Sequence, residues 1–268
     1  MTNIFIETYG CSQNFADSEQ MAGLLQTAQF PVVEKIEDAF IVIINTCTVK
    51  GPTESAFFKR LEEIKAMDPP KLVIIAGCIP QTDPEKLKSY SLLGTKQIHK
   101  VVEIVEEALS ENKIKLLECQ ENPPLHLPRL RKNSLIGIIP IARGCLGHCT
   151  YCKTKAARGD LVSYPILDIK KEVEIALRDG AKEILLTSQD CGCYGFDLNT
   201  NLPNLLKELI TLPPSFKIRI GMMNPNHLMK IKEELLPLYR EQKIYQFLHL
   251  PVQSGNNEIG RASCRERV

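Results

Sequence analysis

Three cysteines lie close together in the sequence, at Cys145, Cys149 and Cys152, with three and then two residues between them. Thiolates are preferred ligands for zinc and for iron–sulfur clusters. Three thiolates can hold a 4Fe–4S cluster and leave one of its irons without a protein ligand. Such an iron can bind a small chelating cofactor, and the amino and carboxylate groups of S-adenosylmethionine would serve. The spacing therefore indicates an iron–sulfur site that activates a bound cofactor.

Zinc is the alternative metal for this loop. A structural zinc site is closed by four ligands, and His148 lies between two of the cysteines as a possible fourth ligand. Closing the chain around one ion from that position is awkward, because the histidine and its neighbours would have to turn towards the same point. The loop thus favours a cluster, and a zinc-stabilised RNA-binding protein without enzyme activity stays as the alternative.

A second set of cysteines, Cys11, Cys47 and Cys78, is spread through the first third of the chain. Each follows a predicted strand, and they are separated by 36 and 31 residues, about one strand–helix unit each. Because the carboxyl ends of parallel strands lie along one edge of a sheet, we expect the three cysteines to converge. Gly10 and Gly77 would let the backbone approach a bulky group closely. The pattern predicts a second iron–sulfur cluster; three small buried residues are the alternative.

Alternating strand and helix signals position these cysteines. Residues 39–45 and 71–76 are apolar runs, as expected for strands buried on both faces. In the first 112 residues we predict strands at 3–8, 39–45 and 71–76, and helices at 17–28, 53–67, 84–90 and 101–112. This order predicts an α/β domain in which helices cover a parallel sheet.

The alternation starts again after residue 133. We predict strands at 135–142, 183–187, 217–221 and 246–252, and helices at 166–179, 202–212 and 227–240. The cysteine loop at 145–152 then follows the first strand of this half, at the end where barrel enzymes place their chemistry. Four strand–helix repeats are too few to close a barrel, so we expect a truncated, partial (β/α) barrel.

The expected domain boundaries follow from these elements. An N-terminal cluster domain covers residues 1–114, and a basic, proline-containing linker at 115–133 leads to the partial barrel at 134–259. We interpret residues 260–268, which are basic and lack apolar spacing, as a cloning scar.

Composition excludes some functions. The 268 residues are 44% hydrophobic and 24% charged with a formal net charge of +1, so nothing global demands a nucleic acid or a membrane as partner. Ten cysteines without a secretory signal favour a reducing, cytoplasmic compartment. No stretch is apolar enough to span a membrane, and no glycine-rich nucleotide motif follows a strand.

Basic residues around the linker and the cysteine loop offer a local surface that would attract an RNA backbone. A plain solvated face is the alternative. These residues are Arg129, Arg131, Lys132, Arg143, Lys153, Lys155 and Arg158.

Five short motifs together resemble the methylthiotransferase family of radical S-adenosylmethionine enzymes. They read TYGCSQN, NTC, AGC, RGC and LPVQSG, at residues 8–14, 45–47, 76–78, 143–145 and 250–255. The similarity runs from about residue 3 to residue 258. Family members join an N-terminal cluster domain to a radical barrel and a small C-terminal RNA-binding β-barrel.

One branch of the family is matched best. The loop at residues 152–159 is similar to the branch that acts on N6-threonylcarbamoyladenosine at position 37 of tRNA, and lacks the proline usual in the isopentenyladenosine branch. Residues 222–225 are similar to archaeal and eukaryotic members. The resemblance implies conversion of this nucleoside to its 2-methylthio derivative, with the tRNA anticodon loop as partner. Methylthiotransferases for isopentenyladenosine tRNA or for a ribosomal protein aspartate are the alternatives.

The resemblance also implies roles for the two cysteine triplets. The later cluster would cleave S-adenosylmethionine, and the adenosyl radical would abstract hydrogen from C2 of the adenine. The earlier cluster would present the inserted sulfur, and a second S-adenosylmethionine would give the methyl group. Candidate cofactor contacts are Tyr151, Gln189, Arg219 and Gln253. Nothing indicates the electron donor.

The chain departs from the family pattern at its end. About two barrel repeats and the RNA-binding β-barrel have no counterpart, so we expect the chain by itself to be weakly active or inactive.

Overall fold

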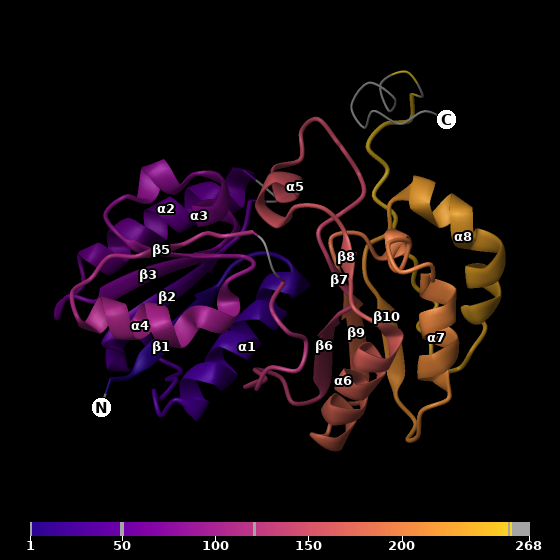
Figure 1. Ribbon diagram of the computed structural model, residues 1–268, viewed down its shortest axis with the longest axis horizontal. Coiled ribbons are helices and arrows are strands. Elements are labelled where there is room, and N and C mark those ends of the chain that lie inside the picture. The colour runs from indigo at the N-terminus through magenta and orange to yellow at the C-terminus, as the bar shows by residue number, and fades with distance from the viewer. Residues whose placement is uncertain (1, 49–50, 120–121, 257, 259–268) are drawn as a thin grey trace. The chain divides into compact units, whose positions relative to one another are not determined.

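The computed structural model describes residues 2–48, 51–119, 122–256 and 258 (Figure 1). Contacts divide the chain into two compact units. The first contains Met1–Leu130 together with the short segment Ala156–Arg158, and the second contains Arg131–Lys155 and Gly159–Val268. The N-terminal unit therefore includes three residues that follow the second cysteine triplet in the sequence.

The N-terminal unit is built on a five-stranded sheet in which every neighbouring pair is parallel. The strands, in both chain and spatial order, are β1 (Ile4–Thr8), β2 (Ile41–Thr46), β3 (Leu72–Gly77), β4 (Ser91–Gly94) and β5 (Lys115–Leu116). Every residue of β2 is buried, as its unbroken apolar run predicts for a strand covered on both faces. The predicted α/β class with a parallel sheet is confirmed.

Helices cover both faces of this sheet. They are α1 (Ser12–Thr27), α2 (Gly51–Lys65), α3 (Cys78–Thr82) and α4 (Val101–Leu109), with single 3-10 turns η1 (Ile36–Asp38), η2 (Pro84–Leu87) and η3 (Ile98–Lys100). Alternate residues of β2 enter two separate cores, since side chains of a strand point to opposite faces. Ile43 packs with Leu25 of α1, whereas Ile44 packs with Phe57 of α2.

The main differences from the predicted elements are local. In place of the helix expected at 84–90 only the 3-10 turn η2 forms, preceded by the short helix α3, which was not predicted. The strands β4 and β5 were not predicted because four and two residues are too short to show a pattern. Helix α1 begins at Ser12, five residues before the predicted start. Its first turn holds Gln13 and Asn14, which are polar yet buried, so the expected apolar spacing is absent there.

The second unit contains a smaller parallel sheet in the order β10-β9-β6. Its strands are β6 (Ile136–Pro140), β9 (Glu183–Thr187) and β10 (Lys217–Ile220), and its helices are α6 (Ile166–Arg178), α7 (Leu202–Ile210) and α8 (Pro225–Leu238). The unit also contains a short antiparallel pair, β7 (Ala142–Arg143) and β8 (Val162–Ser163), and the 3-10 turn η4 (Cys191–Cys193). Helix α5 (Lys153–Arg158) divides between the two units. The expected partial barrel is confirmed.

The fourth barrel strand predicted at residues 246–252 is wrong, since no strand forms there. Just before this segment Ile244 forms an isolated parallel bridge with Ile218 of β10, and within the segment His249 O accepts the N–H of Met223. Side chains 246–249 are all exposed, so the segment has no inward face that would hold it in register.

No helix among the described residues is long and apolar enough to cross a membrane. The segment interpreted as a cloning scar, 260–268, lies outside the described residues.

Candidate iron–sulfur sites

Three cysteines follow three adjacent strands of the N-terminal sheet. Cys47 comes directly after β2, Cys78 directly after β3, and Cys11 ends the short turn that follows β1. The strands are in parallel register, with Thr8 opposite Asn45 and Asn45 opposite Ala76. The three cysteines therefore lie along one edge of the sheet, as the sequence predicted.

Cys11 and Cys47 lie close together. A Cβ on Gly10, whose φ is +103°, would lie 2.4 Å from the Cys47 sulfur, so this turn accepts only glycine. The two thiols hydrogen-bond to each other. Cys11 is also the N-cap residue of helix α1, where its backbone oxygen accepts the N–H groups of Asn14 and Phe15 at 3.0 and 3.3 Å.

These contacts favour the thiolate at Cys11. The hydrogen bond from Cys47 lowers the pKa of the Cys11 thiol most, burial opposes it, and the charge of Arg158 and the helix N–H groups add to the lowering, so the pKa is about 6. Burial is the largest influence on Cys78, where it raises the pKa, and Arg158 opposes it by charge and by a hydrogen bond. Cys47 and Cys78 are 1% and 2% exposed.

This edge fits an iron–sulfur cluster better than a single ion. Among the described residues, these three sulfurs do not form a group within 4.8 Å of one another, the spacing that suits one metal. A cluster binds each cysteine to a different iron and so holds its ligands farther apart. Two side chains next to the cysteines in sequence, Gln13 and Thr48, are buried with polar atoms that find no partner in the described part of the chain. A bound polar group would remove that cost.

The later cysteines lie on a half-buried loop that follows β7. Gly144 has a φ of +73°, and a Cβ there would lie 1.9 Å from the carbonyl oxygen of Asp160. Its N–H donates to the side chain of Gln189 at 2.7 Å. Glycine is required here by both conformation and space, and Gln189, which follows β9, fixes the start of the loop.

The sulfurs of Cys145 and Cys149 lie close to the same glycine. A Cβ on Gly147 would be 3.4 Å from the first sulfur and 3.9 Å from the second. The Cys152 sulfur accepts the Lys155 N–H at 3.4 Å and so caps α5. The loop thus gathers two sulfurs around one turn, and the third is held at a helix N-terminus.

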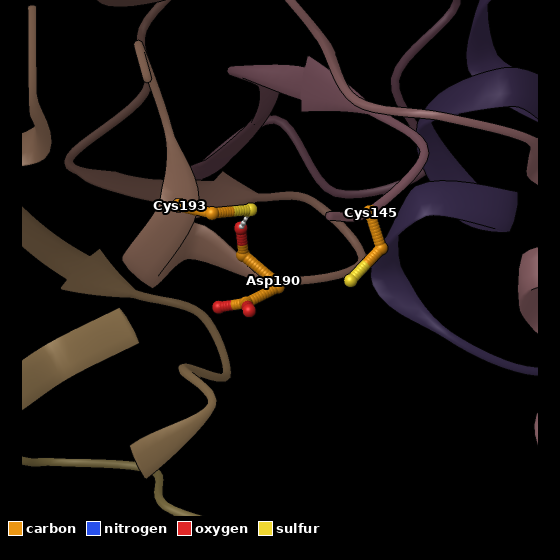
Figure 2. A group of neighbouring side chains, drawn as sticks. All are labelled: Cys145, Asp190 and Cys193. Carbon is orange, nitrogen blue, oxygen red and sulfur yellow. Dashed lines mark hydrogen bonds between the residues drawn. The ribbon is translucent and has the colours of Figure 1, made fainter. Parts of the chain in front are cut away.

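A group that the sequence did not predict involves the first of these cysteines. The ligand atoms of Cys145, Asp190 and Cys193 lie within 4.8 Å of one another (Figure 2). The Cys193 thiol donates to the backbone oxygen of Asp190 at 3.3 Å, and His227 Nδ1 lies 2.5 Å from the Asp190 carboxylate. The carboxylate also accepts the backbone N–H groups of Gly192 and Asn224.

Hydrogen bonds in this group shift the pKa values of its members. The hydrogen bond from Cys193 lowers the pKa of Cys145 to about 7 against the effect of burial, while that of Cys193 is raised. The hydrogen bond to Asp190 raises the pKa of His227. Neither Cys193 nor His227 is among the site residues predicted from the sequence. Their positions, just after β9 and on the first turn of α8, were the available signal.

The predicted cofactor contacts all lie in the second unit. Gln189 supports the cysteine loop, Tyr151 is 55% exposed within it, and Gln253 is exposed. The Arg219 guanidinium lies 5.1 Å from the ring centre of Phe247. Their roles in cofactor binding stay predictions.

Two members of the predicted basic surface are not on a surface. Arg143 and Arg158 are each 2% exposed. Arg143 donates to the Tyr164 hydroxyl at 2.9 Å, and Arg158 pairs with Asp17 at 2.9 Å. Neither guanidinium is free to meet an RNA backbone, so that expectation is wrong for both.

Two family models match the chain. The model of the uncharacterized protein family UPF0004 matches residues 3–94, and that of the radical SAM superfamily matches residues 139–268. The chain thus carries a radical SAM domain behind a UPF0004 domain. This class implies an iron–sulfur cluster and S-adenosylmethionine as cofactors.

The curated relatives narrow the class. The chain is 44% identical, over 99% of its length, to the probable threonylcarbamoyladenosine tRNA methylthiotransferase of Pyrococcus horikoshii, and 41% identical, over 98%, to the human threonylcarbamoyladenosine tRNA methylthiotransferase. It spans 63% and 47% of those two proteins. The resemblance to methylthiotransferases is confirmed.

Solved structures agree on the fold. The radical S-adenosylmethionine methyltransferase TsrM from Kitasatospora setae, solved with tryptophan and a SAM analogue, superposes with a TM-score of 0.64 at 13% identity. The match covers 96% of this chain and 60% of TsrM. At that identity the likeness supports the fold alone.

Proposed function

We propose that the chain is the matched part of a methylthiotransferase that converts N6-threonylcarbamoyladenosine at position 37 of tRNA to its 2-methylthio derivative. The observation that carries the proposal is the gathering of Cys11, Cys47 and Cys78 at one edge of the sheet, in a chain that also carries a radical SAM domain. A radical enzyme that only cleaves its cofactor needs one cluster. A second three-cysteine site suits a reaction that also inserts sulfur.

The two sites divide the work. Cys145, Cys149 and Cys152 hold one 4Fe–4S cluster, which together with S-adenosylmethionine supplies the one-electron chemistry that activates the adenine carbon. The other three cysteines hold a second cluster. Gln189 keeps the later loop in place through the N–H of Gly144.

The earlier site is suited to metal binding at neutral pH. Thiolates, rather than thiols, bind iron. With a pKa of about 6, the Cys11 thiol is largely ionised at pH 7. A tRNA anticodon loop is the substrate and partner that the named relatives suggest.

Iron analysis of anaerobically reconstituted protein tests the cofactor content. Two four-iron clusters give about eight irons per chain. Replacing Cys11, Cys47 and Cys78 together by alanine should remove about half of this iron, and replacing Cys145, Cys149 and Cys152 should remove the other half. A zinc-bound chain without iron–sulfur absorption would contradict the proposal and favour a zinc-stabilised RNA-binding protein.

Mass spectrometry of tRNA nucleosides tests the reaction. Cells that lack the full-length protein should lose 2-methylthio-N6-threonylcarbamoyladenosine and accumulate the unmodified form. Loss of methylthio-isopentenyladenosine instead would move the assignment to that branch, and unchanged tRNA would favour a protein aspartate as substrate. Because the chain spans less than two thirds of its relatives, restoration of the nucleoside is expected from the full-length protein and weakly, if at all, from this chain.

A further inference from the structure

Arg158 is a buried cation at the edge of the sheet that carries Cys11, Cys47 and Cys78. Its side chain and that of Asp17 are each 1% exposed and form an ion pair at 2.9 Å. A second nitrogen of the guanidinium donates to Asn14 Oδ1 at 2.7 Å. A fully buried ion pair contributes little net stability, because desolvation offsets the attraction. Its presence therefore calls for another role.

Asn14 connects the arginine to the cysteine turns. Its side-chain oxygen faces both Arg158 and the Cys11 thiol, which lies 3.5 Å away. Its side-chain nitrogen donates to Tyr9 O at 3.1 Å and to Thr46 O at 2.7 Å, the residue just before Cys47. One amide thus joins the turns after β1 and β2, and Arg158 fixes the orientation of that amide.

Arg158 also acts on the thiols by charge. Its guanidinium hydrogen-bonds to the Cys78 thiol, and it shares the side-chain oxygen of Asn14 with the Cys11 thiol. The Nε of Arg158 is buried and has no hydrogen-bond partner among the described residues. One donor of the guanidinium is therefore left over from the contacts with Asp17 and Asn14, on the side chain that contacts Cys78.

The segment that supplies Arg158 is anchored in the N-terminal unit. Residues 156–158 belong to that unit by their contacts, although their neighbours on both sides in the sequence belong to the second. Ala157 O accepts a hydrogen bond of 2.8 Å from the buried Thr95 hydroxyl. Gly159 follows with a φ of +76° and ends α5. The arginine is thus held in place by its own backbone as well as by its partners.

We propose that Arg158 is the positioning residue of the Cys11–Cys47–Cys78 site: it orients the cysteine turns through Asn14, and its charge offsets the negative charge of the thiolates and of the cluster they bind. The inference rests on the proposed function, because it takes these cysteines to be cluster ligands. It adds to that function a residue from a distant segment of the chain.

The reduction potential of the earlier cluster tests the charge. The chain with Cys145, Cys149 and Cys152 replaced by alanine isolates this cluster, and redox titration followed by electron paramagnetic resonance gives its potential. Adding an electron is easier next to a positive charge. R158M should therefore lower the potential, D17N should raise it, and R158K should stay near the parent chain. A purely structural role would move R158M and D17N in the same direction, because both break the same ion pair.

Folding is followed separately by thermal melting of each variant without metal. If the single variants leave an unpaired buried charge and fail to fold, the double variant D17N/R158M removes both charges. Its potential should then lie below that of R158K, because the double variant lacks the cation that contacts Cys78. K170M, which breaks the exposed pair of Lys170 with Glu208 in the second unit, is the control for loss of a positive charge.

The outcomes separate the two proposals. If the isolated earlier site binds no iron, the two-cluster assignment fails and the role of Arg158 fails with it. If the site binds about four irons, but R158M or the double variant keeps the parent potential, the proposed function stands and only the inference about Arg158 is overturned.

Discussion

Replacing Gly10 by alanine should close the space between the first two cysteines. The new Cβ would lie 2.2 Å from Cys47 Cβ and 2.4 Å from its sulfur. A rotation of the Cys47 side chain moves only the sulfur, so the clash with Cβ can be relieved only by shifting the backbone of one turn. The same turn carries Cys11, and the shift should separate the two thiols.

The cost has two parts. A non-glycine residue at a φ of +103° costs about 1–3 kcal/mol, and packing an extra methyl group into a filled interior costs about 1–3 kcal/mol. Together G10A should lose about 2–6 kcal/mol of unfolding free energy. This is a large share of the roughly 5–15 kcal/mol that holds a typical protein folded.

Gly180 provides the matched control. Its φ of +104° is nearly the same, and no atom lies within 4 Å of the position of an added Cβ. G180A should therefore show only the conformational cost of about 1–3 kcal/mol. Urea unfolding of the metal-free chains measures both losses, and iron analysis after reconstitution should show about half the iron in G10A and full iron in G180A. Equal destabilisation of the two variants, with full iron in both, would refute the close approach of the turns.

Two further predictions concern the group around Asp190. Because the hydrogen bond to Asp190 raises the pKa of His227, this pair stabilises the folded chain fully below the ordinary histidine pKa of 6.5 and loses its effect as the pH rises through the raised value. Thermal melts between pH 5 and 9 should show a pH-dependent loss that H227Q lacks, and parallel curves for the two chains would contradict it. C193A should raise the pKa of Cys145 from about 7 towards 9.0, read as a shift in the pH dependence of alkylation of the Cys145 peptide by iodoacetamide. C191A is the control, because the Cys191 sulfur accepts a hydrogen bond from the Ser188 hydroxyl. The same shift of the Cys145 alkylation curve in both variants would refute the role of Cys193.

Strong periodic signals predicted the fold well. The apolar runs of β2 and β3 and the helices α6 and α7 were placed to within a few residues, because burial on both faces of a sheet leaves an unambiguous pattern. Short elements such as β4 left none. Residues 246–252 have the composition of a strand without forming one, because strand formation also depends on a neighbour that the composition does not reveal.

The sequence predicts the positions of the proposed cysteine ligands better than it predicts the residues that support them. Cys11, Cys47 and Cys78 could be brought together on paper because parallel topology places strand ends at one edge, and topology follows from local patterns. The position of Arg158 could not be predicted in this way, because its partner Asp17 lies 141 residues away and neither residue has a spacing that identifies the other. In the sequence it counted as one more basic residue of a possible RNA surface.

The charge of the three proposed thiolate ligands explains why a buried cation such as Arg158 is supplied by a distant segment. The turns that lead to Cys11 and Cys78 are crowded, since even a Cβ on Gly10 or Gly77 would meet a neighbouring atom at 2.2 or 2.4 Å. Three thiolates in one buried place repel one another, and a cation within the same interior is the most direct compensation. A guanidinium reaches such a place only on a chain segment that packs over the edge of the sheet. The segment at residues 156–158 does so, and its ion pair with Asp17 and its bond to Asn14 keep the charge where the thiolates need it.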